Sequence, residues 1–275
     1  MSENIFTFSK FEEFQSYLSD ITLDLDILKD FEYFYRGCSV HDWEYNLTPG
    51  IYRDNRILKE EINFKEMILR NPNDFLNDST TLEKLVKMQH YRLPTRLLDI
   101  TSNPLVALYF ACKPFKDVIS HGKVYVFKIP KEDIKYYDSD AVALISNLAK
   151  LRIHKTNFNA DGFDFLKHEV REEKPYYLDG FDNENERDIT TVFPVKVKLN
   201  NNRIVKQSGA FLIFGMNDLE DKTHQAQFPT NFLFNEILID ETAKARILSI
   251  LNSFAINDYT LFPELEYAAD YLDNQ

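Results

Sequence analysis

Apolar and polar residues follow two different periods along this chain. The segment VFPVKVKL (192–199) places Val195, Val197 and Leu199 between lysines, and this alternation predicts a strand with one exposed face. Four further segments are rich in the β-branched and aromatic residues that pleated sheets favour. These predicted strands are EYFYRG (32–37), GKVYVFKIP (122–130), GAFLIF (209–214) and NEILI (235–239).

Other segments carry the signals of helices. Two pairs with capping-box spacing, Ser9 with Glu12 and Thr80 with Glu83, predict helix starts. The segment LVALYFAC (105–112) has no polar face, so we expect it to form a buried helix. Further helices are predicted over 56–70, from the cap Asn103 with Pro104, and after the cap Asp240.

The order of these elements indicates an α+β fold. Strands and helices interleave without the regular repeat of parallel α/β sheets, so we expect a mixed or antiparallel central sheet with flanking helices. Residues 131–187 mix polar and aromatic segments without one clear period. Because no linker composition separates them from the rest, we predict one domain over residues 1–275 with a helical insertion at about 131–187.

Composition disfavours several classes of function. The net charge of −12 argues against a surface built for bulk nucleic-acid binding. The seven glycines are spaced to form neither a dinucleotide-binding fingerprint nor a phosphate loop. Neither H-E-x-x-H nor C-x-x-C occurs, so the sequence predicts no metal site of these kinds.

The same reasoning bears on where the protein works. No apolar run approaches the roughly 20 residues of a membrane helix. The opening MSENIFTFSK lacks the basic and apolar segments of a signal peptide, and Cys38 and Cys112 cannot form a disulfide scaffold. We therefore expect a cytoplasmic protein without membrane contact, in which both cysteines act as small apolar filler.

The densest group of polar side chains lies in residues 89–104, QHYRLPTRLLDITSNP. Arg96 stands among leucines, and a buried charge needs a partner. One interpretation pairs Arg96 with Asp99 within the segment. The other leaves an arginine available for a carboxylate or phosphate of a ligand. His90 is either a structural histidine or, beside Gln89, part of a site.

Similar alternatives hold elsewhere in the chain. Arg36 ends a predicted strand, where it could bridge to an acidic surface or face a ligand. Gln207 could equally be satisfied inside the sheet at a β-bulge. The acidic pair Glu60-Glu61 lies in a polar helical stretch, which is typical of a solvated face.

Five groups of residues make nearly the whole chain resemble the FRG domain family, which is named for its Phe/Tyr-Arg-Gly signature. They are Tyr35-Arg36-Gly37; Trp43, Leu47, Pro49 and Arg53; Gln89 through Ala111; Arg203, Gln207, Gly209 and Phe211; and Leu261 through Leu265. Two positions depart from the family pattern. Arg92 stands where glycine is usual, and Ile100 stands where tryptophan is usual.

A more distant resemblance is to ADP-ribosyltransferases. In those enzymes a strand-end arginine holds the phosphates of NAD, a Ser-Thr-Ser element braces the nicotinamide ribose, and a glutamate stabilises an oxocarbenium-like centre. Arg36, Thr101-Ser102 and Gln207 resemble these elements in the same order. Gly209 stands where the glutamate would be. Either Asp99 or an unaligned glutamate supplies the carboxylate, or the chemistry is lost.

The resemblance implies one polar pocket with NAD as the substrate. The arginine surplus of Arg36, Arg92 and Arg96 over Asp99 also favours an anionic small molecule there. The candidate site residues fall into two groups. The catalytic candidates are Asp99, His90 and Gln207, and the NAD-binding candidates are Arg36, Gln89, Arg96, Thr101 and Ser102.

Two functions are therefore expected. The first is an ADP-ribosyltransferase or NAD glycohydrolase, in the manner of an intracellular toxin or phage-defence effector that modifies a macromolecule. The second is a non-enzymatic module that recognises a nucleotide, another anionic ligand or a protein partner. The order of the three elements favours the first function, and the missing glutamate at Gly209 favours the second.

Overall fold

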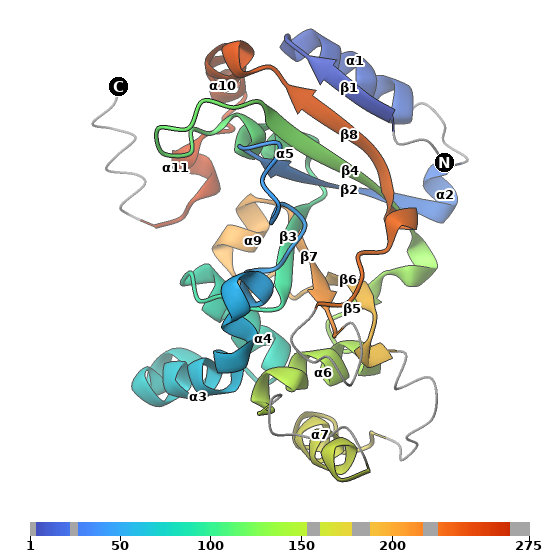
Figure 1. The fold of residues 1–275 in the computed structure, drawn as a ribbon, viewed down its shortest axis with the longest axis vertical. Coiled ribbons are helices and arrows are strands. Elements are labelled where there is room, and N and C mark those ends of the chain that lie inside the picture. Colours follow the sequence, from blue (N-terminus) through green and yellow to red (C-terminus); the bar gives the residue numbers. More distant parts are fainter. Residues whose placement is uncertain (1–3, 23–26, 153–159, 178–187, 217–224, 265–275) are drawn as a thin grey trace.

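The fold is described from a computed structural model of the chain (Figure 1). It describes residues 4–22, 27–152, 160–177, 188–216 and 225–264. Within these residues, eight strands form one sheet in the order β1-β8-β4-β2-β3-β7-β6-β5. In chain order the strands are β1 (Asn4–Phe8), β2 (Phe31–Cys38), β3 (Leu97–Thr101), β4 (Gly122–Pro130), β5 (Lys135–Tyr136), β6 (Val192–Lys196), β7 (Gly209–Phe214) and β8 (Leu233–Ile239).

The sheet is mostly antiparallel. Only the two outermost pairs, β1 with β8 and β5 with β6, run parallel among the described strands. The mixed sheet with flanking helices confirms the α+β prediction. The helices between β5 and β6 likewise agree with the predicted helical insertion.

The sheet is weakest in its middle. Strand β2 pairs with β4 over eight residue pairs, and β3 pairs with β7 over five. In contrast, β2 and β3 share only the pair Tyr35 and Thr101. Beyond this pair the two strands diverge, so the sheet consists of two halves joined at a narrow junction.

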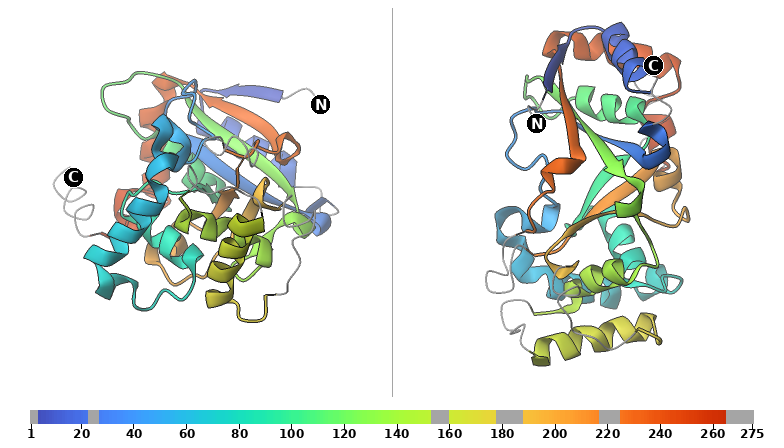
Figure 2. Two further views of the ribbon diagram at one scale, coloured as in Figure 1. Left: turned by 60° about the horizontal axis from the view of Figure 1, so that its bottom comes forward. Right: turned by 90° about the vertical axis from the view of Figure 1, so that its right-hand side faces the viewer.

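Each half of the sheet carries its own group of helices (Figures 1 and 2). The group at one end packs in a cluster with β2, β4 and β8, and the group at the other end packs with β3, β6 and β7. The first group contains α1 (Phe11–Thr22), α5 (Pro104–Cys112) and α10 (Lys244–Ser253). The second contains α3 (Glu60–Arg70), α4 (Thr81–His90), α6 (Asp140–Asn147) and α7 (Ala160–Glu173).

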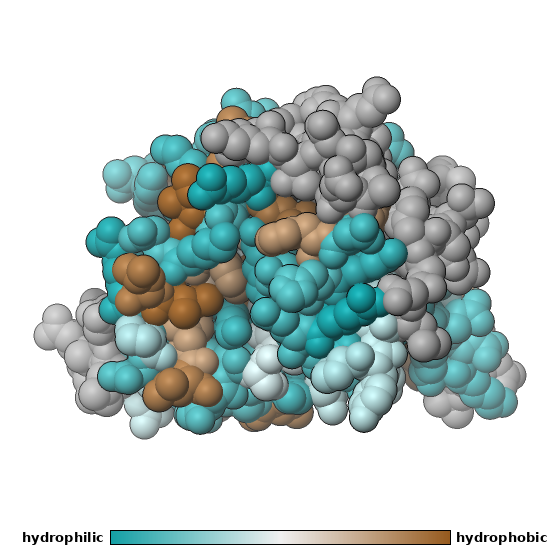
Figure 3. Space-filling model, turned by 90° about the horizontal axis from the view of Figure 1, so that it is seen from below, coloured by the Kyte–Doolittle hydropathy of each residue, from teal (hydrophilic) through white to brown (hydrophobic). Residues whose placement is uncertain are grey.

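Shorter helices complete the fold. The α-helical ones are α2 (Ile27–Asp30), α9 (Asn202–Lys206) and α11 (Asp258–Leu261). The 3-10 segments are η1 (Gly50–Lys59), η2 (Pro72–Phe75), η3 (Lys131–Asp133), η4 (Leu148–Lys150), η5 (Thr230–Phe232) and η6 (Glu241–Ala243). None of the described helices combines the length and apolar character that a membrane crossing requires. Figure 3, which views the molecule from below, shows separate brown patches among mostly teal side chains.

Local signals place the helices beside the site. Thr80 and Glu83 form the predicted capping box of α4, and the side chain of Asn103 caps α5 by accepting from the amide of Leu105. At the start of α1, the carboxylate that accepts from the Ser9 amide is that of Glu13 rather than the predicted Glu12. The cap therefore closes one residue later than its sequence spacing indicates.

Two glycines allow α5 to lie directly on the sheet. A Cβ added to Gly37 on β2 would lie 1.8 Å from the carbonyl oxygen of Ala107, and one on Gly122 of β4 would lie 2.2 Å from that of Ala111. Any side chain at either position would push the helix away from the strands. The glycine of the Tyr-Arg-Gly signature is thus a packing requirement that brings α5 next to Arg36.

Two strands differ from the sequence prediction. The sequence patterns do not predict β1, and β3 lies inside residues 89–104, where the dense polar side chains and Pro94 indicate a loop. Five consecutive pairs with β7 hold β3 in the sheet, even though Asp99 at its centre is exposed. Pairing with a distant strand overrides the local polar pattern in this segment.

Candidate functional site

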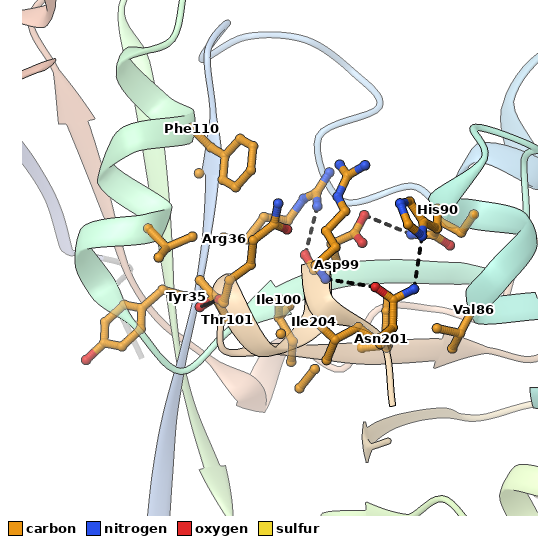
Figure 4. Close-up of a pocket in the computed structure, with 18 residues that line it drawn as sticks. Tyr35, Arg36, Val86, His90, Asp99, Ile100, Thr101, Phe110, Asn201 and Ile204 are labelled. Carbon is orange, nitrogen blue, oxygen red and sulfur yellow. Dashed lines mark hydrogen bonds between the residues drawn. The ribbon is translucent and has the colours of Figure 1, made fainter. Parts of the chain in front are cut away.

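A pocket of about 270 Å³ lies where the two halves of the sheet meet. Its floor comes from β2, β3 and β7, and its walls come from α4, α5 and α9 (Figure 4). Phe110 on α5 stands at one end and Val86 and His90 on α4 at the other, with Arg36 and Asp99 between them. The pocket therefore opens between the two groups of helices, at the point where β2 and β3 diverge.

Arg36 bridges the gap between the diverging strands. Its Nη1 donates to the main-chain carbonyl of Asp99 at 2.8 Å, and its Nε donates to the carbonyl of Asn46 at 2.8 Å. The guanidinium thus replaces main-chain hydrogen bonds that β2 and β3 do not make to each other. Among the described residues, no carboxylate oxygen lies within 4 Å of its nitrogens. The positive charge of Arg36 is therefore fixed in place by main-chain carbonyls, without a carboxylate partner in the part of the chain that the structure describes.

The carboxylate of Asp99 is exposed in the same pocket. Its Oδ2 accepts from Nε2 of Gln89 at 2.8 Å, and Oε1 of Gln89 in turn accepts from the hydroxyl of Thr95. Because its amide is held at both ends, Gln89 has one orientation. Asp99 is the single acidic residue among the side chains that line the pocket.

His90 lies between two other polar groups. Oδ1 of Asn201 accepts from the amide of Arg203 as the cap of α9, so Nδ2 of Asn201 is the donor to Nδ1 of His90 at 3.0 Å. This arrangement leaves the proton on Nε2, which lies 2.5 Å from Oε1 of Glu264. The tautomer of His90 is thus set by a helix cap.

The contact with His90 changes the pKa of the Glu264 carboxyl group. Burial disfavours its charged form, but the hydrogen bond with His90, with a further contribution from Arg203, outweighs burial and lowers its pKa. Its Oε2 is buried and has no hydrogen-bond partner among the described residues. Glu264 lies 174 residues from His90, so no local sequence pattern connects the two.

Thr101 and Gln207 line the pocket at the start of β7. The hydroxyl of Thr101 donates to the carbonyl of Gln207 at 2.6 Å, and Nε2 of Gln207 donates to the carbonyl of Leu261 at 3.2 Å. The amide of Gln207 therefore fastens the end of α11 to the pocket wall. Within the described part of the chain, the amide oxygen of Gln207 has no hydrogen-bond partner.

Arg203 adds a second positive charge to the pocket. It projects from α9, and its guanidinium lies 4.9 Å from the centre of the Phe262 ring. The sequence shows Arg203 as part of a family motif, but it was not placed among the site residues. Two arginines, Arg36 and Arg203, line the pocket with one aspartate, so the pocket has a local positive surplus in which Arg36 was predicted and Arg203 stands in place of Arg92 and Arg96.

Arg96 does not belong to the pocket, contrary to the sequence prediction. It is 0% exposed and forms a two-pronged ion pair with Glu60 of α3, in which Nε lies 3.0 Å from Oε1. Its Nη1 also donates to the carbonyl of Phe214 at 3.1 Å. Arg96 directly precedes β3 and lies three residues before Asp99, so in this extended segment their side chains point to opposite faces and do not pair.

This pair also corrects the interpretation of the acidic pair on α3. Glu60 and Glu61 are 3% and 5% exposed and are not a solvated face. Glu60 holds Arg96, and Glu61 forms ion pairs with Lys65 and Arg152. Burial disfavours the charge of Glu61, but its hydrogen bond and attraction to Lys65 outweigh burial and lower its pKa.

Two other predicted contributors lie outside the pocket wall. Ser102 is exposed, and its amide and hydroxyl both donate to the carbonyl of Ser208, so it ties β3 to the turn before β7. Arg92 is also exposed, at the end of α4. Ile100, which replaces the usual tryptophan, is buried in the core and contributes to the pocket floor.

Arg92 occupies a position that suits glycine. Its φ is +66°, its amide donates to the carbonyl of Gln89, and the amide of Leu93 donates to that of Met88. These two bonds form a Schellman motif, in which the residue after the helix cap takes the left-handed conformation. The usual family glycine has a physical reason here, and Arg92 adopts the strained conformation in its place.

The loop between β2 and η1 provides a hydrogen-bond acceptor for Arg36. Arg53 donates to the carbonyls of Thr48 and Tyr45 and lies 4.8 Å from the centre of the Trp43 ring. Burial first, and the nearby charge of Arg36 second, lower the pKa of Arg53 to about 10. The spaced tryptophan and arginine of the family motif therefore shape the loop that presents the Asn46 carbonyl to Arg36.

A comparison with known families matches part of the chain. Residues 31–118 match the family model of the FRG domain. The chain contains an FRG domain. The matched range includes β2, α4, β3 and α5, and so Arg36, Gln89 and Asp99, whereas Arg203 and Gln207 on the opposite wall lie outside it. No curated protein and no solved structure matches the chain.

Proposed function

We propose that the pocket of the FRG domain binds NAD and that the protein cleaves its nicotinamide-ribose bond, with transfer of ADP-ribose to an acceptor. The observation that carries the proposal is the convergence of Arg36 and Asp99 in one pocket. Arg36 offers a charge that no carboxylate of the described ranges neutralises, which suits a diphosphate. Asp99 offers an exposed carboxylate on the neighbouring strand.

The lining of the pocket fits the nicotinamide half of NAD. At about 270 Å³ it is close to the lower end of small-ligand pockets, roughly 300 Å³, which suits part of a dinucleotide rather than all of it. Phe110 offers an apolar wall, and the oxygen of the Gln207 amide offers a polar contact to a ribose or carboxamide.

Asp99 is the candidate for the role of the missing glutamate. When the bond between ribose C1′ and nicotinamide breaks, nicotinamide leaves with the electron pair and positive charge develops on the ribose. A fixed carboxylate beside that carbon stabilises the charge until a nucleophile on water or on the acceptor forms the new bond. Gln89 orients Asp99 for this role and leaves one carboxylate oxygen for the ligand.

The experiment measures binding and turnover separately. Calorimetry with NAD and ADP-ribose reports binding, and labelled NAD with a cell lysate reports nicotinamide release and label transfer. We expect both activities in the parent chain. Asp99→Asn is the matched control, because it keeps an oxygen for Gln89 while removing the charge. This variant should bind NAD and lose turnover. Turnover that is unchanged in Asp99→Asn would reject Asp99 as the catalytic carboxylate.

A second candidate function is recognition of a nucleotide or another anionic ligand without chemistry. Gly209 favours it, because it lies in the pocket wall at the position where ADP-ribosyltransferases carry the glutamate. Steric hindrance does not explain the absence of a side chain there, since a Cβ on Gly209 would meet Ile204 atoms at an ordinary 3.6 Å. Tight NAD binding without nicotinamide release or label transfer would support this function over the first.

The acceptor and the biological setting rest on the resemblance alone. If label is transferred, the labelled species in the lysate identifies the class of macromolecule. A toxin or phage-defence role would then be tested by expressing the parent chain and Asp99→Asn in bacterial cells. Arrested growth or protection from phage with the parent only would support that role.

A further inference from the structure

A second hollow adjoins the pocket on the other side of Arg36. It measures about 280 Å³ and is lined by the end of β2, the loop that follows it and the end of α5. Three residues line both hollows: Arg36, Gly37 and Phe110. The guanidinium of Arg36 therefore stands between two spaces of similar size.

Exposed aromatic side chains distinguish the second hollow. Trp43 and Phe115 line it, and they are 42% and 41% exposed. Their ring centres are 6.1 Å apart with an angle of 32° between the ring planes. Large aromatic rings that remain open to solvent beside a hollow are typical of binding surfaces.

Trp43 is held in place by the loop behind it. The guanidinium of Arg53 lies 4.8 Å from its ring centre and is fixed by the carbonyls of Thr48 and Tyr45. The Tyr45 ring packs edge-on at 5.8 Å. The indole is thus oriented before any ligand arrives, which reduces the entropy lost on binding.

We propose that the second hollow is the subsite for the purine base of the dinucleotide, with the base stacked on Trp43 and Phe115. The inference rests on the proposed function. The diphosphate would lie at Arg36, which both hollows share, and the nicotinamide nucleoside would occupy the first pocket. Each hollow would then hold one nucleoside. Aromatic rings suit this role because every base presents a π-face.

Trp43 is the one tryptophan of the chain, so its fluorescence reports directly on the second hollow. NAD, ADP-ribose and AMP should change its emission. Nicotinamide mononucleotide should leave the emission unchanged while competing with NAD in calorimetry, because it carries no purine. Free tryptophan amide, titrated in parallel, corrects for light absorbed by the nucleotides.

Variants test the same contact by affinity. Trp43→Ala should weaken NAD binding about ten-fold and leave the affinity for nicotinamide mononucleotide unchanged. Trp43→Phe should keep most of the NAD affinity, which separates loss of stacking from misfolding. Ile119→Ala is the matched control, because Ile119 is 86% exposed nearby but lines neither hollow.

The outcomes separate this inference from the proposed function. If NAD binds without changing Trp43 emission, and Trp43→Ala binds NAD like the parent, the subsite is rejected and NAD binding stands. If AMP changes the emission but NAD does not bind, the purine site stands and the proposed function fails. If only an aromatic peptide changes the emission, the hollow is an acceptor site and the purine subsite is rejected.

Discussion

Arg96 and Arg36 both hold strand β3 in place, yet their surroundings differ in one decisive respect. Arg96 is fully buried, and its charge is neutralised by Glu60. Arg36 makes equally short hydrogen bonds, but it donates them to two main-chain carbonyls. Both guanidiniums are therefore oriented, whereas only that of Arg96 has a carboxylate partner among the described residues.

The comparison shows that orientation and charge compensation are separate requirements. A buried arginine needs both, because an uncompensated charge away from water is strongly destabilising. An arginine at the rim of a pocket needs orientation alone, since solvent stabilises its charge until an anion binds. The arginine that lacks a carboxylate partner is therefore the better candidate for a ligand contact.

The largest expected effect is on stability, when the carboxylate partner of Arg96 is removed. Glu60→Ala leaves the guanidinium buried without a partner and should lower the free energy of unfolding by about 3–5 kcal/mol. Chemical denaturation of the variant and the parent measures the loss. Asp99→Ala is the matched control and should change stability far less, because Asp99 is exposed.

A double variant shows whether charge is the cause. Replacing Glu60 and Arg96 together by methionine removes both charges, and it should recover much of the stability lost in Glu60→Ala. A double variant as unstable as Glu60→Ala would instead point to packing as the main contribution of these side chains.

The next largest effect is on NAD affinity, when Arg36 is replaced. Arg36→Ala removes the charge and the oriented fork, so NAD affinity should fall by about 100-fold, whereas Arg36→Lys keeps the charge and should lose less. Calorimetry with NAD, ADP-ribose and ATP measures the two losses. Arg96→Lys provides the contrast, since Arg96 does not line the pocket. Equal NAD affinity in the parent and Arg36→Ala would remove the basis for the phosphate site.

The two arginines also show how far the sequence could predict the site. Arg36, Gln89, His90, Asp99, Thr101 and Gln207 were expected in one pocket and do line one. The family motifs identified these residues in the sequence. In the fold, they line the space where β2 diverges from β3. Arg96 was misplaced because its partner lies 36 residues earlier, on a helix whose acidic pair resembles a solvated face.

The fold was predictable where a local signal is strong. The capping box of α4 identified that helix, whereas the alternation of valine and lysine at 195–199 predicted a longer strand than β6, which ends at Lys196. Strand β3 was not predicted, because Pro94 and Asp99 give its segment a loop-like pattern and its pairing with β7 is remote in sequence. A buried arginine requires a carboxylate, so a search for acids in the apolar-flanked helix 60–70 could have found Glu60.

A third arginine in the same segment provides a smaller effect. Arg92 has a left-handed backbone, so Arg92→Gly should be more stable than Arg92→Ala by about 1 kcal/mol. Both variants lose the same side-chain contacts, and their difference isolates backbone strain. Thermal unfolding of the two measures it. Equal stability of the two variants would show that the Schellman turn tolerates a side chain without strain.

The smallest expected effect is on the pH dependence of stability, through the carboxylate of Glu264 beside the pocket. Burial raises the pKa of Glu264, but the hydrogen bond with His90 and the charge of Arg203 more than offset this, so its pKa in the folded protein is lowered. A carboxyl group with a lowered folded pKa stabilises the fold above its unfolded pKa, and that stabilisation is lost as pH falls through the folded pKa. Glu264→Gln should therefore flatten the acid side of the stability profile and leave its alkaline side unchanged.

His90→Gln, which removes the imidazole contact to Glu264, should flatten the same acid side of the profile. Urea denaturation across a series of buffers measures both profiles, and an acid side as steep in both variants as in the parent would show that this contact does not contribute to stability.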